Sequence, residues 1–148
     1  MLIELSGNFN VISSSQDAAD LTRGVLLARD IYDQEKEHVF VIGLDLDRNV
    51  KYLDLVSIGT QDACLMHPRE VFRRAVAEMA SSIILIHNHP GKNIQASPAD
   101  YRTTFQCMAA GKLLGIPVDA SLIISTKTND FRSLPAHIPT EYQNFDFS

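Results

Sequence analysis

The sequence predicts a single α/β domain over residues 1–148, with a mixed β-sheet and helices on its faces. Three observations support this fold class. A chain of 148 residues has the usual size of one compact domain. Its composition, 45% hydrophobic and 21% charged, is ordinary for a globular protein that fills a core. Segments with helical and strand periodicity alternate along it in the order α-β-β-α-β-α-β.

The first half of the chain is predicted to hold one helix and a β-hairpin. Apolar residues recur at three-to-four spacing after Ser15, the expected N-cap, and this helix should end near Tyr32. Residues 38–46 are β-branched and apolar enough for a buried strand. Turn residues at 47–49 lead into a second strand over 50–58, so we expect an antiparallel pair.

A second helix and a buried strand follow an irregular stretch over residues 59–66. Pro68 suits the first turn of the helix. The apolar stripe of this helix comprises Val71, Phe72, Ala75, Val76 and Met79. Residues 82–86 form a continuous apolar run, which predicts a central strand covered on both faces.

The last helix has the clearest start signal in the chain. Residues 97–100 combine a Ser cap, a Pro at the first helical position and an acid at the third. The helix should run to about Leu114, because Gly115 follows it. Residues 118–125 then resemble another strand, and the tail from Asn129 onward is weakly specified.

Composition also limits the functions that the chain can have. The net charge of −5 argues against tight nucleic-acid binding, which needs clustered Lys and Arg. Arg69, Arg73 and Arg74 lie close together but are best interpreted as the solvated face of a helix. Cys64 and Cys107 are too far apart for a thiolate zinc site. Without a signal-peptide pattern or a membrane-spanning apolar run, the sequence predicts a soluble, cytoplasmic protein.

The residues that follow the buried strand suggest a metal site. His87 and His89 stand two apart, and in an extended segment such residues point to the same side. Asp100, on the first turn of the next helix, can fold back over the strand end. Two imidazoles and a carboxylate leave a fourth tetrahedral position for water on a zinc ion. Zinc would lower the pKa of that water to roughly 7.

A zinc-bound water also needs a proton acceptor outside the metal's own ligands. The acidic candidates that precede the histidines are Glu35, Glu37, Glu70 and Glu78. Glu37 is best placed because it opens the first predicted strand, but Glu35 could face the same side and remains an alternative. The Ser97 hydroxyl could cap its helix and also donate a hydrogen bond to a developing oxyanion.

Each of these residues also has an ordinary structural interpretation. A His-x-His pair is common by chance, and residues 88–91 make an adequate turn. Asp100 is explained as a capping-box acid, and Glu37 as a solvated charge beside Lys36. These interpretations do not explain why two histidines leave the most apolar strand and meet a Ser and an Asp on the following helix.

The spacing of these residues resembles that of a known family. His87-x-His89, seven residues, Ser97, two residues and Asp100 reproduce the JAMM signature of the JAB/MPN metalloproteases. The flanking sequence is most similar to the RadC-like branch of that family, and the similarity covers roughly residues 15–126. It includes Gly59-Thr60, the segment His67-Pro68-Arg69-Glu70-Val71-Phe72, His87-Asn88-His89-Pro90 and Leu114-Gly115-Ile116-Pro117.

The resemblance implies a specific site and fold. It makes His87, His89 and Asp100 the ligands of one Zn²⁺ per chain, Glu37 the acid/base, and Ser97 an aid to the tetrahedral intermediate. The implied fold is the cytidine-deaminase-like α/β sandwich of MPN domains. The deaminases themselves are disfavoured, because their His-x-Glu and Pro-Cys-x-x-Cys motifs are absent from the sequence.

Two positions depart from the RadC-like pattern. Pro90-Gly91-Lys92 stands where Pro-Ser-Gly is usual, which could alter the loop over the metal. Ala120-Ser121 stands where Asp-His is usual, which removes a polar pair near the site. Neither change touches the expected ligands.

The resemblance therefore supports three functional hypotheses. The first is a zinc metallopeptidase or isopeptidase acting on a peptide or protein, including a ubiquitin-like conjugate. The second is a binding module with a catalytically silent site. The third is a DNA-repair or mobile-element protein, which the acidic balance and the lack of room for the family's helix-hairpin-helix region disfavour. Specificity would come from residues 62–67, 92–96 and the tail, and the sequence does not indicate an oligomeric state.

Overall fold

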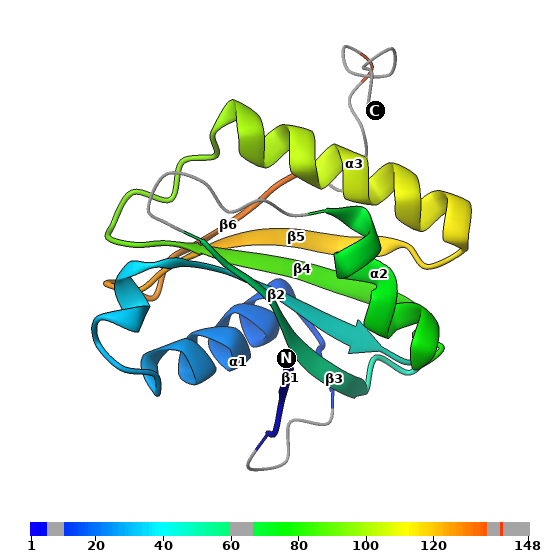
Figure 1. Cartoon of the computed structure of the whole chain (residues 1–148), viewed down its shortest axis with the longest axis horizontal. Helices are drawn as coiled ribbons and strands as arrows, with labels where there is room; N and C mark the ends of the chain where they lie inside the picture. Colours follow the sequence, from blue (N-terminus) through cyan, green and yellow to red (C-terminus); the bar gives the residue numbers. More distant parts are fainter. Residues whose placement is uncertain (6–10, 60–66, 136–139, 141–148) are drawn as a thin grey trace.

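A six-stranded mixed sheet organises the protein, in the strand order β1-β3-β2-β4-β5-β6. The computed structural model describes residues 1–5, 11–59, 67–135 and 140. Helix α1 covers one face of the sheet, and helices α2 and α3 cover the other (Figure 1). This arrangement confirms the predicted α/β class with a mixed sheet. None of the helices in the described part of the chain is long and apolar enough to cross a membrane.

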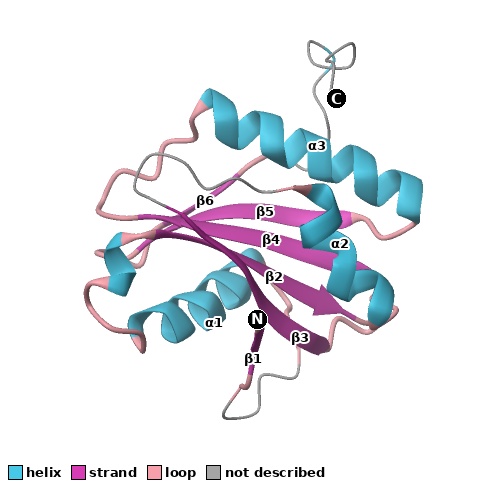
Figure 2. Cartoon of the chain, in the orientation of Figure 1, coloured by secondary structure: helices cyan, strands magenta, loops and turns pink. Residues whose placement is uncertain are grey.

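The elements follow the predicted order, with a short strand added at each end (Figure 2). The strands are β1 (Leu2–Ile3), β2 (Glu37–Leu44), β3 (Val50–Gly59), β4 (Ser82–His89), β5 (Val118–Ser125) and β6 (Phe131–Ser133). The helices are α1 (Ser15–Leu27), α2 (Pro68–Ala77) and α3 (Pro98–Leu114), with a 3-10 turn η1 at Asp33–Glu35. Strands β4 and β5 are parallel, and the other neighbouring strands are antiparallel.

Alternation along the central strand β4 separates the two apolar cores. Ile84 and Ile86 pack in the core beneath α1. Ile83 and Leu85 pack in the core beneath α2 and α3. Because side chains two apart in a strand share a face, this alternation directs the side chains at 87 and 89 toward α2 and α3. Position 88 points toward α1.

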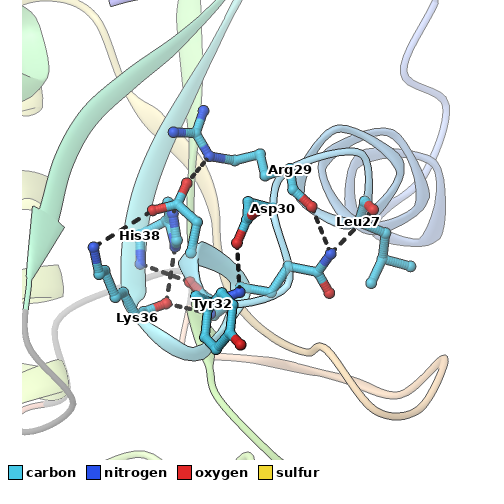
Figure 3. Close-up of polar contacts among 9 residues, drawn as sticks. Leu27, Arg29, Asp30, Tyr32, Lys36 and His38 are labelled. Atoms are coloured by element: carbon cyan, nitrogen blue, oxygen red, sulfur yellow. Dashed lines mark hydrogen bonds and ion pairs between the residues drawn. The ribbon is translucent and has the colours of Figure 1, made fainter.

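Helix α1 is shorter than predicted, and its N-cap lies one residue earlier than predicted. Its N-cap is Ser14 rather than Ser15, and the Ser14 hydroxyl accepts a hydrogen bond from the Asp17 amide at 3.3 Å. The helix ends at Leu27 rather than near Tyr32, and the Gln34 side chain bonds carbonyls at and just beyond its C-terminal end. The Gln34 amide donates to the carbonyls of Leu27 and Arg29, at 3.1 and 2.8 Å (Figure 3).

The apolar stripe of α2 was predicted too long. Val71, Phe72 and Ala75 are buried, whereas Val76 is 52% exposed and Met79 is 81% exposed. Helix α2 ends at Ala77, and Met79 lies beyond it with a left-handed φ of 55°. The turn therefore carries its side chain away from the sheet.

Strand ends also differ from the predictions. Strand β2 ends at Leu44 rather than at residue 46, because the Asp45 carboxylate accepts the amides of Asp47 and Asn49 and starts the turn early. Strand β4 continues to His89 rather than ending at residue 86. The irregular stretch predicted over 59–66 falls outside the described residues, except for Gly59, which is the last residue of β3.

Candidate metal centre

Strand β4 presents His87 and His89 together on the face that α3 covers. His87 is only 3% exposed, and the side chain of His89 is largely buried. Their ring centroids lie 5.2 Å apart. The histidines are thus held within the sheet itself rather than in a loop beyond it, and the hydrogen bonds of β4 to β5 run through His89.

The first turn of α3 supplies the carboxylate. Ser97 and Asp100 form the predicted capping box, in which the Ser97 amide donates to Asp100 Oδ2 at 2.8 Å and the Asp100 amide donates to Ser97 Oγ at 3.1 Å. The cap fixes the orientation of the carboxylate. Asp100 Oδ1 lies 3.1 Å from His87 Nε2, and Asp100 Oδ2 lies 3.1 Å from His89 Nε2.

This arrangement has the chemistry of a divalent-metal site. One donor atom from each of His87, His89 and Asp100 can be chosen so that all three lie within 4.8 Å of one another. Zinc bonds of about 2.0–2.1 Å in a tetrahedral geometry place donors about 3.3 Å apart, close to the separations seen here. Both ring nitrogens of His87 are buried and make no hydrogen bond among the described residues. A buried imidazole that makes no hydrogen bond but faces a carboxylate fits a cation between the two groups.

Electrostatics link the three side chains. Burial raises the pKa of Asp100, but the imidazoles of His87 and His89 outweigh burial and hold it well below its usual value. The hydrogen bond to Asp100 raises the pKa of His89, while burial opposes the rise and the charge of Glu37 adds to it. The carboxylate is therefore ionised at neutral pH and available as a ligand.

The sheet register separates the two candidates for the proton acceptor. Val39 of β2 pairs with His87 of β4, and Glu37 shares the face of Val39. Glu37 is half-buried, and its charge contributes to the raised pKa of His89. Glu35 is exposed in η1, before the strand begins. The structure therefore brings Glu37, not Glu35, toward the two histidines.

The other two acidic candidates lie on α2. Glu70 is exposed in the first turn of the helix. Glu78 caps its end and lies 3.9 Å from Arg74. Neither is among the main causes of the shifted pKa values of His89 and Asp100.

The loop between β4 and α3 has supports that the sequence did not reveal. The ring Nδ1 of His89 lies 3.3 Å from the carbonyl oxygen of Asn93, which orients the opposite nitrogen toward Asp100. Arg132 of β6 donates to the carbonyl of Ile94 at 3.1 Å. The buried Ser125 hydroxyl donates to the carbonyl of Gly91 at 2.5 Å. A lone Arg on a three-residue strand leaves no pattern by which it could have been predicted.

The two departures from the family pattern occupy different places. Gly91 adopts a φ of 108°, a conformation that strongly favours glycine, so the loop over the site depends on this residue. Ser121 is buried in β5, and its hydroxyl lies 3.0 Å from that of Thr104 on α3. Ser121, which is smaller than the usual His, thus links β5 to the helix that carries Asp100.

Comparison with known proteins identifies the family. The sequence model of the RadC-like JAB domain matches residues 12–137, most of the chain. The chain belongs to this family. It is also 39% identical over 118 residues to a UPF0758 protein of Chlorobaculum tepidum, covering 74% of the chain and 52% of that protein. A UPF0758 protein of Caldanaerobacter subterraneus is 36% identical over 124 residues, covering 84% of the chain and 51% of that protein.

Family membership fits the metal-site geometry but does not transfer a whole protein's activity. The chain spans about half the length of the curated relatives it matches. The names of these relatives state no reaction, substrate or partner. The function of this RadC-like JAB domain must therefore be argued from its own residues.

Proposed function

We propose that the protein is a zinc-dependent hydrolase that cleaves a peptide or isopeptide bond with water. One observation supports this most directly. His87, His89 and Asp100 place three metal donors together, and Glu37 lies on the same face of the sheet. Three protein ligands leave a coordination position open, which distinguishes catalytic from structural zinc sites.

Each side chain has a defined task in this proposal. A zinc ion held by His87, His89 and Asp100 would polarise the scissile carbonyl and lower the pKa of water to roughly 7. Glu37 accepts the proton of the attacking water and passes it to the leaving amine, so that one carboxylate serves as base and then as acid. The Ser97 hydroxyl accepts the capping hydrogen bond through its lone pair. Its proton can therefore be donated to the developing oxyanion.

The substrate class in this proposal comes from family membership together with the charge of the chain. We infer a peptide or protein, and isopeptide-linked conjugates of ubiquitin-like proteins are one class to test. The net charge of −5 gives no support for nucleic acid as the substrate.

The matched pair Glu37→Gln and Glu35→Gln tests the proposal. The zinc-loaded variants are compared on a randomised library of internally quenched peptides, with zinc content measured by emission spectroscopy. Glu37→Gln should lower hydrolysis by about 10²–10⁴-fold with zinc retained, because a general base is lost while the ligands stay. Glu35→Gln should hydrolyse like the wild type.

Two results would contradict the proposal. Full hydrolysis by Glu37→Gln would show that another group accepts the proton. A wild-type protein that binds zinc but cleaves neither the library nor isopeptide-linked conjugates would support a binding module instead.

A further inference from the structure

Asn88 lies between the two histidines of β4 but points to the opposite face of the sheet. Its side chain is completely buried, on the α1 side where Ile84 and Ile86 pack. An amide in such surroundings is costly unless its polar atoms are hydrogen-bonded. Its bonding partners therefore indicate why an amide is present.

Both polar atoms of Asn88 bond to the backbone around Glu37. Asn88 Oδ1 accepts a hydrogen bond from the His38 amide at 2.6 Å. Asn88 Nδ2 donates to the carbonyl oxygen of Lys36 at 3.0 Å. These two groups belong to the peptide units immediately before and after Glu37, so one side chain holds Glu37 from both sides.

This contact occurs where the backbone pairing of β2 and β4 stops. The register between the two strands runs from Leu44↔Ser82 to Val39↔His87. Continued pairing would place Glu37 opposite His89, but no such pair is formed, and β4 pairs there with β5. The Asn88 amide thus replaces strand pairing at the point where β2 brings Glu37 to the metal centre.

A second side chain secures the same peptide unit. The ring Nδ1 of His38 lies 2.8 Å from the carbonyl oxygen of Lys36 (Figure 3). A carbonyl can only accept, so this ring nitrogen carries the proton. The Lys36 carbonyl therefore accepts hydrogen bonds from Asn88 and His38 together, which restricts the backbone before Glu37.

We infer that Asn88 is a positioning residue that sets Glu37 relative to the three metal donors. The inference rests on the proposed function, because it gives Glu37 a position that matters for hydrolysis. Asn88 couples the strand of the histidines to the strand of the base, whereas its own side chain lies on the other face and contacts neither metal nor substrate.

The first measurement uses metal-free protein and requires no substrate. Amide hydrogen exchange at His38 is compared by NMR in wild type, Asn88→Ala and the control Thr22→Val. Thr22 is also fully buried and donates one hydrogen bond, to the Ala18 carbonyl within α1 at 2.9 Å. Exchange at His38 should be at least about tenfold faster in Asn88→Ala, since its acceptor is lost, and unchanged in Thr22→Val.

The second measurement is a double-mutant cycle on the zinc-loaded protein with the quenched-peptide library. Asn88→Ala should lower hydrolysis by about 10- to 100-fold, the effect expected when a reacting group is misplaced by about 1 Å. In the Glu37→Gln background the same substitution should change the residual rate less than about twofold, because its effect acts through Glu37. Zinc affinity should stay within about threefold of the wild type, because the ligands remain.

Three results would overturn the inference. One is unchanged His38 exchange in Asn88→Ala. Another is an equal loss of activity with and without the Glu37 carboxylate. The third is a matching loss in Thr22→Val, which would indicate a general effect of stability.

Two further outcomes are distinguishable. If Asn88→Ala does not fold, the near-isosteric Asn88→Leu fills the same space without either hydrogen bond, and it should show the same pattern. If the wild type shows no zinc-dependent hydrolysis, the proposed function fails, while the exchange measurement still tests the hold on Glu37.

Discussion

Two buried histidines, His38 and His87, occupy opposite faces of the same sheet, and each has a carboxylate nearby. His38 Nε2 lies 3.6 Å from Asp33, and His87 Nε2 lies 3.1 Å from Asp100. Neither nitrogen makes a hydrogen bond among the described residues. The difference between the two sites lies in what else surrounds each carboxylate.

The carboxylate of Asp33 is already neutralised by basic side chains. Arg29 donates to it in a short ion pair, and Lys36 Nζ lies 3.8 Å from it (Figure 3). Among the described residues, Asp100 has ion pairs only with His87 and His89, and it also accepts a capping hydrogen bond from the Ser97 amide. A partly buried carboxylate compensated by an arginine and a lysine is structural, whereas one that faces two imidazoles can share a metal ion with them.

The largest expected effect separates these two carboxylates. Asp100→Asn should weaken zinc binding by about 100-fold or more, because even partners outside the ligand shell are worth 10–100-fold. Asp33→Asn should leave zinc affinity unchanged. Competition with a chromophoric chelator measures both, and equal losses would mean that Asp100 is not a ligand.

His87 and His38 should also differ in how their substitution affects the rise in Tm that zinc causes. Zinc at about 100 times its Kd should stabilise the wild type by about 2.7 kcal/mol. For a chain of this size, that corresponds to a rise in Tm of about 5–10 °C. His87→Asn should abolish the rise. His38→Asn should lower the starting Tm but retain the rise, and a rise that survives in His87→Asn would exclude this site as the source.

The N-caps of α3 and α1 allow a second comparison, in which the expected effects are smaller. Ser97→Ala should lower the free energy of unfolding by about 1 kcal/mol, the usual loss of an N-cap, and should weaken zinc binding up to about tenfold. Ser14→Ala removes the cap of α1 at a similar loss in stability. Because Ser14 has no contact with the site, the zinc affinity of the Ser14→Ala variant should equal that of the wild type. Chemical denaturation and chelator competition on both variants make the comparison.

The smallest effect is a pH-dependent contribution of Arg29. Its hydrogen bond to Asp33 lowers the pKa of that carboxyl below the ordinary value of 3.8. A lowered folded-state pKa means that the stabilisation is complete above about pH 4 and is lost as the pH falls through the folded value. Arg29→Gln should therefore cost about 0.5–1 kcal/mol at neutral pH. The difference between the two proteins in urea denaturation should shrink as the pH falls below 3.8, and a constant difference would point to packing.

The sequence carried enough local information to predict how the side chains of His87, His89 and Asp100 are arranged. Alternation in an apolar strand places His87 and His89 on one face, and a capping box fixes Asp100 whatever the rest of the fold does. Gly115 ends α3 as expected, with a left-handed φ of 73°. These features depend on neighbours within a few residues, and they were predicted correctly.

What could not be predicted depends on partners distant in sequence. Glu35 and Glu37 are separated by the point where β2 begins and by its register against β4, neither of which the sequence specifies. Arg132 and Asn88 act on backbone groups 38 and 52 residues away, without any periodic pattern. Strands β1 and β6 have two and three residues, too few for alternation to appear. The hydrogen bond to the C-terminal end of α1 comes from the side chain of Gln34, outside the helix.

The spacing of the site along the chain has a consequence for the order in which the molecule assembles. His89 and Asp100 are 11 residues apart, whereas Asn88 and His38 are 50 apart. The entropic cost of closing a loop rises with its length, so the donor cluster can form from one short segment before the sheet is complete. Glu37 arrives only when β2 has docked against β4. The proposed metal donors therefore come together before the proposed base, so the proposed hydrolysis would begin only once β2 is in place.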